Sequence, residues 1–259
     1  GGFTSAITNL IDVDQYLRSL AVAVLSGTTD NYGAVGDVHN GQFYVRPGDN
    51  RVLFFPHDLD LGANATAPIT HADVSKLIAF PAHARAYYRH LRDMITTTCN
   101  SAYMAHWTEN FGRLLPDQDF PSYLPFFDAR ADYVLSQINQ AAPLVAFAIT
   151  SNNGGNFQSS SNLLTLEGNG WLDVAAIEVN GIPCAIQWIG ITRWSITIPL
   201  AGGANRLAIQ GVDGSGGRPA NLADLITVTN TGTAALLPVV INEWMADSAA
   251  PGGFPDPAD

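Results

Sequence analysis

Four side chains in the first quarter of the sequence are of the kinds that bind divalent cations or move protons: Asp30, Asn40, Asp58 and Asp60. Asp58 and Asp60 lie just beyond the apolar run 52–55, at the exit of an expected strand, where side chains leave a rigid sheet. Two carboxylates there suit a hard cation such as Mg²⁺. Asn40 opens the preceding expected strand, so a hairpin would bring Asn40 and Asp58 to the same end of the ladder.

A carboxylate and an amide oxygen that face the phosphates of a nucleotide are how protein kinases hold magnesium. Asp30 lies in a loop after an expected helix, ten residues before Asn40, where a catalytic base would stand. Spacing alone leaves alternatives open. Asp58 and Asp60 could cap the next turn while Asp30 forms an Asx turn, or they could be the metal pair of a sugar-nucleotide transferase. No βαβ alternation surrounds the pair, which disfavours the transferase.

Helices and one hairpin are expected to position these residues. Residues 14–25 repeat apolar side chains at helical spacing, Asp12 or Asp14 can cap them, and Ser26-Gly27 can end the helix. Residues 42–45 and 51–55 are strand-like, with a Pro-Gly-Asp-Asn turn between them. Three further helical stripes are predicted to face the core: Tyr87, Tyr88, Leu91, Met94 and Ile95; Tyr103, Trp107, Phe111 and Leu114; and Leu124, Phe127, Ala131, Val134, Leu135 and Ile138.

The composition changes at residues 141–143. Short β-type runs separated by clusters of glycine and asparagine follow, at 145–150, 163–166, 175–179, 194–198 and 207–212. This pattern predicts an antiparallel β-sandwich. Its tryptophans, Trp171, Trp188 and Trp194, could line a sugar-binding face, but tryptophans of this kind more often anchor a core.

Length and charge narrow the function classes. A chain of 259 residues favours more than one domain, and we place the divisions at 1–142, 143–230 and 231–259. The net charge is -11 and Lys76 is the single lysine, so nucleic acid and anionic membranes are not expected partners. No apolar run is long enough to span a bilayer, and residues 1–10 do not have the pattern of a signal peptide.

The segments DQYLRSLAVAVLSGTTDNY, VHNGQFYV and VLFFPHDLDLG resemble the spore-coat CotH kinase family in order, spacing and residue type. The family shows a helix that ends near an Asp, then a His-Asn or Asn-Asn before an aromatic strand, then Pro-Trp-Asp-Leu-Asp and a Gly. The segments YYRHLRDMITTTCNSAYMAHWTENFGRLLP and RADYVLSQI resemble its helical tail, so the likeness covers roughly residues 5 to 140.

The resemblance implies an α+β kinase-like C-lobe, mostly helical with a β-hairpin. The segments GNGWLDVAAIEVNG and WSITIPLAGGANRLAIQGVDGSG resemble Ig-like modules, so we expect a multidomain protein in which an all-β Ig-like sandwich follows the C-lobe. It implies ATP and Mg²⁺ as cofactors and Ser or Thr of an exported or cell-surface protein as the acceptor. Asp30 would be the catalytic Asp, and Asn40, Asp58 and Asp60 would be the metal residues. His57 departs from the family's Trp. The phosphate-covering loop and its lysine are also missing from this sequence. Either the N-lobe precedes Gly1 in the full protein or the molecule lacks it, and we expect residues 1–142 alone to bind ATP poorly.

Two further expectations come from the resemblance. Residues 239–244 resemble the opening strand of a lamin-tail domain, which often follows CotH domains, and this favours a secreted or cell-surface bacterial protein. The alternative function is a catalytically degenerate kinase fold that serves as a structural or adhesive extracellular module. The sequence does not give the oligomeric state.

Overall fold

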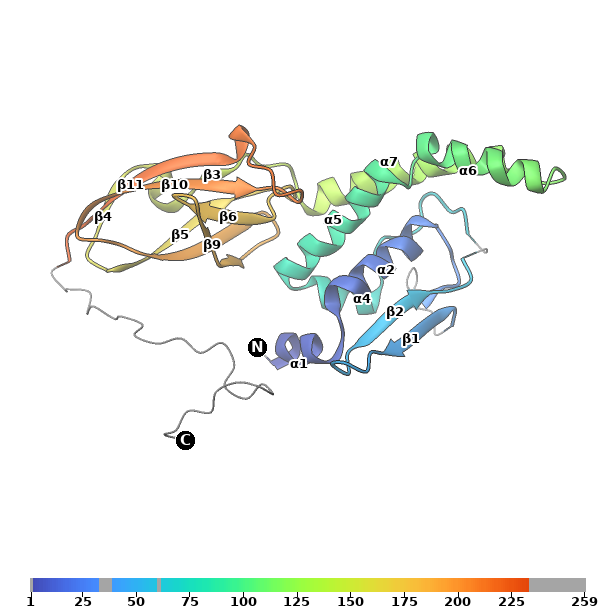
Figure 1. Ribbon diagram of the computed structural model, residues 1–259, viewed down its shortest axis with the longest axis horizontal. Helices are drawn as coiled ribbons and strands as arrows, with labels where there is room; N and C mark the ends of the chain where they lie inside the picture. Colours follow the sequence, from blue (N-terminus) through green and yellow to red (C-terminus); the bar gives the residue numbers. More distant parts are fainter. Residues whose placement is uncertain (1, 33–38, 60–61, 233–259) are drawn as a thin grey trace, which may run out of the picture.

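The structure, a computed structural model, describes residues 2–32, 39–59 and 62–232. Helices and one hairpin form the first half of the chain, and two β-sheets form the second (Figure 1). The expected mixture of a mostly helical part and an all-β part is confirmed. We call residues 2–142 the helical region and residues 143–230 the β-sandwich.

The helical region is built around two helices that pack against each other, α2 and α5. Asp12 caps α2 by accepting a hydrogen bond from the Gln15 N–H, and Pro81 occupies the first turn of α5. Tyr87 and Leu91 of α5 are fully buried against Leu17 and Leu20 of α2, as the helical spacing predicted. The helices are α1 (Gly2–Leu10), α2 (Val13–Leu25), α4 (Ala72–Ile78), α5 (Pro81–Thr97), α6 (Ser101–Leu114) and α7 (Leu124–Ala141).

The predicted hairpin is confirmed, with β1 at Gly41–Val45 and β2 at Val52–Pro56. The two strands are antiparallel, with Gly41 opposite Pro56 and Phe43 opposite Phe54. Phe54 is fully buried and its ring lies 5.3 Å from that of Tyr16 on α2. The hairpin therefore lies against α2 through one face (Figure 1).

The prediction that the α6 stripe faces the core is wrong. Tyr103, Trp107, Phe111 and Leu114 are between 41% and 75% exposed. Figure 1 shows α6 reaching away from the rest of the helical region. Helical periodicity correctly grouped these residues on one face, because Trp107 and Phe111 stack with ring centroids 6.2 Å apart. Periodicity does not say whether another element covers that face.

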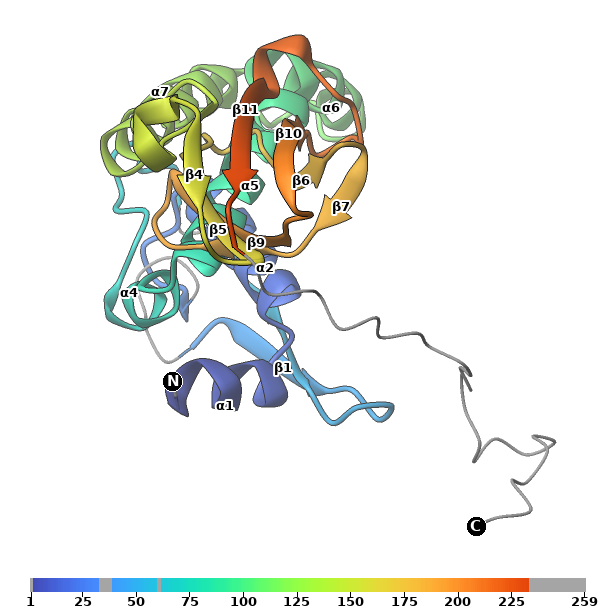
Figure 2. The same cartoon turned by 90° about the vertical axis from the view of Figure 1, so that its left-hand side faces the viewer.

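The β-sandwich consists of two sheets with apolar side chains between them. One sheet has the strand order β4-β11-β10-β6-β7 and the other has the order β3-β5-β9-β8. Figure 2 shows the strands of the first sheet side by side. Only the β4–β11 pair is parallel among the described strands. The strands are β3 (Ala148–Ile149), β4 (Phe157–Ser159), β5 (Leu163–Asn169), β6 (Ala176–Val179), β7 (Ile182–Cys184), β8 (Ile186–Trp188), β9 (Arg193–Pro199), β10 (Gly203–Val212) and β11 (Ala223–Asn230).

The three sandwich tryptophans do not form a common face for sugars. Trp194 is fully buried in the sandwich core, where it stacks on Phe147 and covers Gly168. A Cβ at Gly168 would lie 2.0 Å from the Trp194 ring, so only glycine fits there. Trp171 and Trp188 instead lie at the junction with the helices, where Trp171 Nε1 donates to the Ala142 carbonyl at 2.9 Å.

Two sequence expectations fall on residues that the structure does not describe. These are the metal role of Asp60 and the lamin-tail resemblance at residues 239–244. Within the described ranges, no helix is long and apolar enough to cross a bilayer.

Candidate active site

The loop that carries Asp30 begins with a tight turn at the end of α2. Ser26 is the C-cap of this helix, and Gly27 follows with a φ of 66°. A Cβ at Gly27 would lie 2.8 Å from the Asn64 carbonyl oxygen and 2.9 Å from the Phe126 ring. Glycine therefore allows both the left-handed turn and the close packing of the loop against residues 64 and 126.

Asn31 ties this loop to both strands of the hairpin. Its side chain is fully buried, and its amide nitrogen donates to the carbonyl oxygens of Asn40 and of His57, the latter at 2.8 Å. The backbone N–H of His57 also donates to the Asn40 carbonyl at 3.1 Å. The predicted placement of Asn40 and Asp58 at the same end of the hairpin is confirmed, because Asp58 directly follows His57.

The Asp30 carboxylate is held between two neutral donors. The Thr28 hydroxyl donates to Oδ1 at 3.1 Å, and the Asn40 amide nitrogen donates to Oδ2 at 3.3 Å. The same amide nitrogen donates to the Asp30 backbone carbonyl at 3.1 Å. Asn40 has a φ of 57°, a left-handed conformation that asparagine tolerates better than most residues. Asp30 and Asn40 are thus in direct contact, although ten residues separate them.

These contacts leave the Asn40 amide oxygen available as a ligand. Both hydrogen bonds of the Asn40 side chain to described residues use its nitrogen. An amide whose nitrogen is fixed by hydrogen bonds presents its oxygen in a defined direction. Carboxylate and amide oxygens are ligands that Mg²⁺ accepts.

Asp58 is exposed and has a φ of 55°. A left-handed conformation costs a non-glycine residue roughly 1–2 kcal/mol, so the chain changes direction at Asp58 at some cost in free energy. Among the described residues, the Asp58 carboxylate accepts no hydrogen bond and makes no ion pair, so no turn-capping contact of this side chain is seen there. The Asx-turn alternative for Asp30 is likewise not seen, since its carboxylate contacts Thr28 and Asn40 instead.

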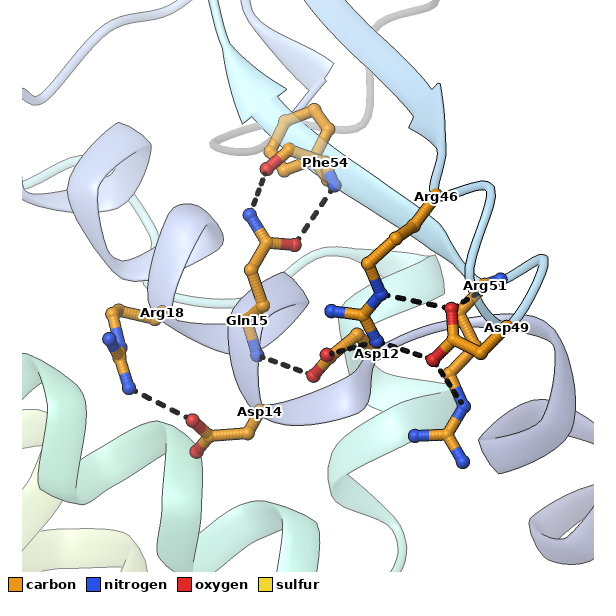
Figure 3. A network of polar contacts seen from close by, with 8 residues as sticks. All are labelled: Asp12, Asp14, Gln15, Arg18, Arg46, Asp49, Arg51 and Phe54. Carbon is orange, nitrogen blue, oxygen red and sulfur yellow. Dashed lines mark hydrogen bonds and ion pairs between the residues drawn. The ribbon is translucent and has the colours of Figure 1, made fainter. Parts of the chain in front are cut away.

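Gln15 fixes the hairpin to α2. Figure 3 shows its side chain accepting from the Phe54 N–H at 3.0 Å and donating to the Phe54 carbonyl at 2.7 Å. In the same figure Arg46 bridges Asp12, at 3.1 Å, and Asp49 at the hairpin turn. The N-terminal end of α2 is therefore tied to β2 and to the turn, while Asn31 ties the loop after α2 to the other end of the hairpin.

Arg130 is a positioning residue that sequence reasoning missed. Its guanidinium is fully buried and donates to the carbonyl of Val24, at the end of α2, and to those of Ala65 and Ala67. It thereby joins the helix before Asp30 to the segment after Asp58. Arg130 directly precedes Ala131 of the apolar stripe on α7. That position weakly indicates a buried arginine, and a buried arginine needs buried hydrogen-bond acceptors.

A small cavity opens beside Asn40. It has a volume of about 210 Å³ and is lined by Tyr32, His39, Gly41 and Phe43. Tyr32 accepts a hydrogen bond from the Tyr16 hydroxyl at 3.1 Å and packs edge-on against His71. Burial lowers the pKa of His71, and its Nε2 atom is buried without a hydrogen-bond partner. The cavity therefore has aromatic walls next to the candidate metal residues.

The oxygen donors fit a magnesium site in kind. No group of three or more His, Cys, Asp or Glu side chains gathers anywhere in the described part of the chain. The metal residues predicted from the sequence would not be found by that criterion, because they include the amide of Asn40 and Asp60, which lies outside the described residues. Lys76 is exposed and its ammonium group pairs with Asp73 at 2.9 Å, so the single lysine of the chain is already engaged.

Residues 1–120 match the family model described as CotH kinase protein. The resemblance predicted from the sequence is thereby confirmed for this part of the chain, which includes Asp30, Asn40, Asp58 and Asp60. The first part of the chain is similar to the CotH kinases, and the match ends before α7 and the β-sandwich. No curated protein matches the chain.

Proposed function

We propose that residues 1–142 are the C-lobe of an ATP- and Mg²⁺-dependent Ser/Thr protein kinase of the CotH type. Asp30 orients or deprotonates the acceptor hydroxyl. Asn40 and Asp58 hold the metal, and Asp60 is a second ligand or a support. The observation that carries the proposal is the direct contact of Asp30 with Asn40, within a loop that Asn31 fixes to both strands of the hairpin.

The chemistry assigned to each residue follows from its contacts. Thr28 and Asn40 donate to the two oxygens of the Asp30 carboxylate and restrict its orientation. A carboxylate held in this way can accept the proton of a serine or threonine hydroxyl. When bound, Mg²⁺ would neutralise charge on the transferred phosphate. The exposed Asp58 carboxylate and the free Asn40 oxygen are the described atoms suited to hold it.

We further propose that the β-sandwich is an Ig-like module of a secreted or cell-surface bacterial protein, and that a lamin-tail domain begins after residue 231. The acceptor would be another exported or cell-surface protein. The acidic character of the chain supports this setting over binding to nucleic acid.

Phosphate transfer by the full-length polypeptide tests the kinase assignment. Asp58→Asn and Asp30→Ala should each reduce transfer of the γ-phosphate from radiolabelled ATP by at least roughly 100-fold, the usual scale for losing general-base or metal-binding groups. Asp117→Asn is the matched control, because Asp117 is an exposed carboxylate beyond α6. Transfer that survived both site substitutions would show that the roles are wrongly assigned.

The second candidate is a degenerate kinase fold with a structural or adhesive role. The position of Lys76 favours it, because the single lysine of this sequence lies on α4, after Asp58, and this sequence has no phosphate-covering loop. A thermal-shift titration of the full-length polypeptide with Mg-ATP distinguishes the two. A bound nucleotide raises the melting temperature through RT ln(1 + [L]/Kd), whereas a flat response up to millimolar Mg-ATP would support the structural role.

A further inference from the structure

A larger cavity lies at the junction of the helical region and the β-sandwich, away from the candidate active site. Its volume is about 710 Å³, within the usual range for sites that bind small molecules. Its lining comes from α2 and α5 on one side and from two sandwich loops on the other. Its lining carries charges of both signs: the guanidinium groups of Arg18, Arg89 and Arg92 and the carboxylates of Asp14, Asp93, Asp173 and Asp213.

Two of its arginines are not neutralised by a neighbouring carboxylate. Arg89 and Arg92 lie three residues apart on α5, so they project from the same side of the helix. Both are half-buried, and neither makes an ion pair or hydrogen bond with any described residue. The Arg92 guanidinium carbon lies 4.6 Å from the centre of the Trp171 ring. The third arginine, Arg18, is different because it pairs with Asp14 at 3.0 Å.

The facing wall supplies an acceptor that lacks a donor. Asp173 lines the cavity from the sandwich side, and its Oδ1 atom is buried without a hydrogen-bond partner. Asp213 is already used within its own loop, where it accepts from Ser215 and Gly217. A buried carboxylate oxygen without a donor is costly. The opposite walls therefore present two guanidinium groups without an ion pair to a described residue and one buried carboxylate oxygen without a donor. Asp93, the remaining carboxylate of the lining, is exposed.

We propose that this cavity binds a small hydroxylated anion of the class of sugar phosphates and sugar acids. Arg89 and Arg92 would hold the oxyanion, since paired guanidinium forks match phosphate and carboxylate oxygens. Asp173 accepts from a hydroxyl group of the same molecule. A ligand held this way touches both walls and stabilises the junction.

This site is separate from the proposed kinase centre. Asp14 stands at the start of α2 and the loop with Asp30 follows the other end of that helix, roughly 18 Å away at 1.5 Å per residue. The proposal therefore stands whether or not the chain transfers phosphate, and Asp58→Asn should leave ligand binding unchanged.

Isothermal titration of the chain with glucose 6-phosphate, glucuronate, inorganic phosphate and glucose tests the proposal. We expect saturable binding of glucose 6-phosphate, of glucuronate or of both, and no binding of glucose. Whichever of the two anions binds more tightly identifies phosphate or carboxylate as the natural oxyanion. Arg89→Gln and Arg92→Gln should each weaken binding by about tenfold or more. Arg113→Gln, at an exposed arginine of α6, is the matched control.

Asp173→Asn separates a ligand contact from a general effect on folding. It should weaken binding of the hydroxylated anion relative to that of inorganic phosphate, because the loss of negative charge acts on both anions and only the first has a sugar hydroxyl that donates to residue 173. The proposal is overturned if neither hydroxylated anion binds at millimolar concentration, if glucose binds equally well, or if the arginine variants bind like the control. Equal weakening of both ligands by Asp173→Asn would overturn the role of Asp173.

Discussion

Replacing Arg85 with methionine should uncouple the helical region from the β-sandwich. Arg85 lies on α5 and is only 2% exposed. Its guanidinium donates to four carbonyl oxygens of the sandwich, those of Gly170, Trp171, Val174 and Ile191. It also packs over the Trp188 ring at 3.3 Å. Methionine keeps much of the length of this side chain and removes all of these hydrogen bonds.

The size of the effect follows from two opposing contributions. The two buried carbonyls, those of Gly170 and Val174, lose their donor at about 1–3 kcal/mol each, and the partly buried carbonyls of Trp171 and Ile191 lose less. Burial of the charged guanidinium itself costs several kcal/mol, which the substitution recovers. Burial lowers the pKa of Arg85 to about 9, so the group is still charged at neutral pH. We expect a net loss of about 3–5 kcal/mol, comparable to that of breaking a buried ion pair.

Differential scanning calorimetry measures this directly. We expect the unmodified chain to unfold in one main transition, because the junction joins the two cores. In Arg85→Met the helical transition should fall by roughly 10 °C, at about 2–4 °C per kcal/mol for a chain of this size, and separate from that of the sandwich. Arg113→Met, at an exposed arginine on α6, should leave the profile unchanged. A single Arg85→Met transition within about 2 °C of the unmodified chain would refute the reasoning.

Two other substitutions test how the candidate site is supported. Arg130→Met removes the donor to the carbonyls of Val24, Ala65 and Ala67, so it should lower both the melting temperature and the rate of phosphate transfer. Arg130→Lys should give values between those of Arg130→Met and the unmodified chain. Full phosphate transfer by Arg130→Met would exclude a positioning role for Arg130. His71 has a pKa lowered by burial, so the unfolded chain takes up a proton that the folded chain resists, and stability should fall as pH drops below about 6.5. His71→Phe should reduce the slope of melting temperature between pH 7.5 and 5.5, and an unchanged slope would argue against a buried neutral His71.

Local patterns predicted the elements that position the site. The cap at Asp12, the end of α2 at Ser26 and the hairpin register all follow from residue type and spacing over a few positions. The placement of Asn40 and Asp58 at one end of the hairpin follows from that register. These features are determined by interactions that are close in the sequence, so they can be read from the sequence.

The supporting contacts could not be predicted, because they join residues that are distant in the sequence. Asn31 reaches the His57 carbonyl, 26 positions away, and Arg130 reaches that of Val24, 106 positions away. Arg85 reaches Val174 across 89 positions. The sequence alone does not distinguish a buried arginine from an exposed one, because the carbonyls that accept its hydrogen bonds come from distant parts of the chain. The exposed face of α6 shows the same limit for apolar residues.

The most direct test of the account is a crystal structure of the full-length polypeptide with Mg²⁺ and a non-hydrolysable ATP analogue. The account predicts a metal ion bound by a carboxylate oxygen of Asp58 and the amide oxygen of Asn40, with the Asp30 carboxylate turned toward the acceptor side of the γ-phosphate. A nucleotide bound elsewhere, or a metal ion that contacts neither Asn40 nor Asp58, would contradict it.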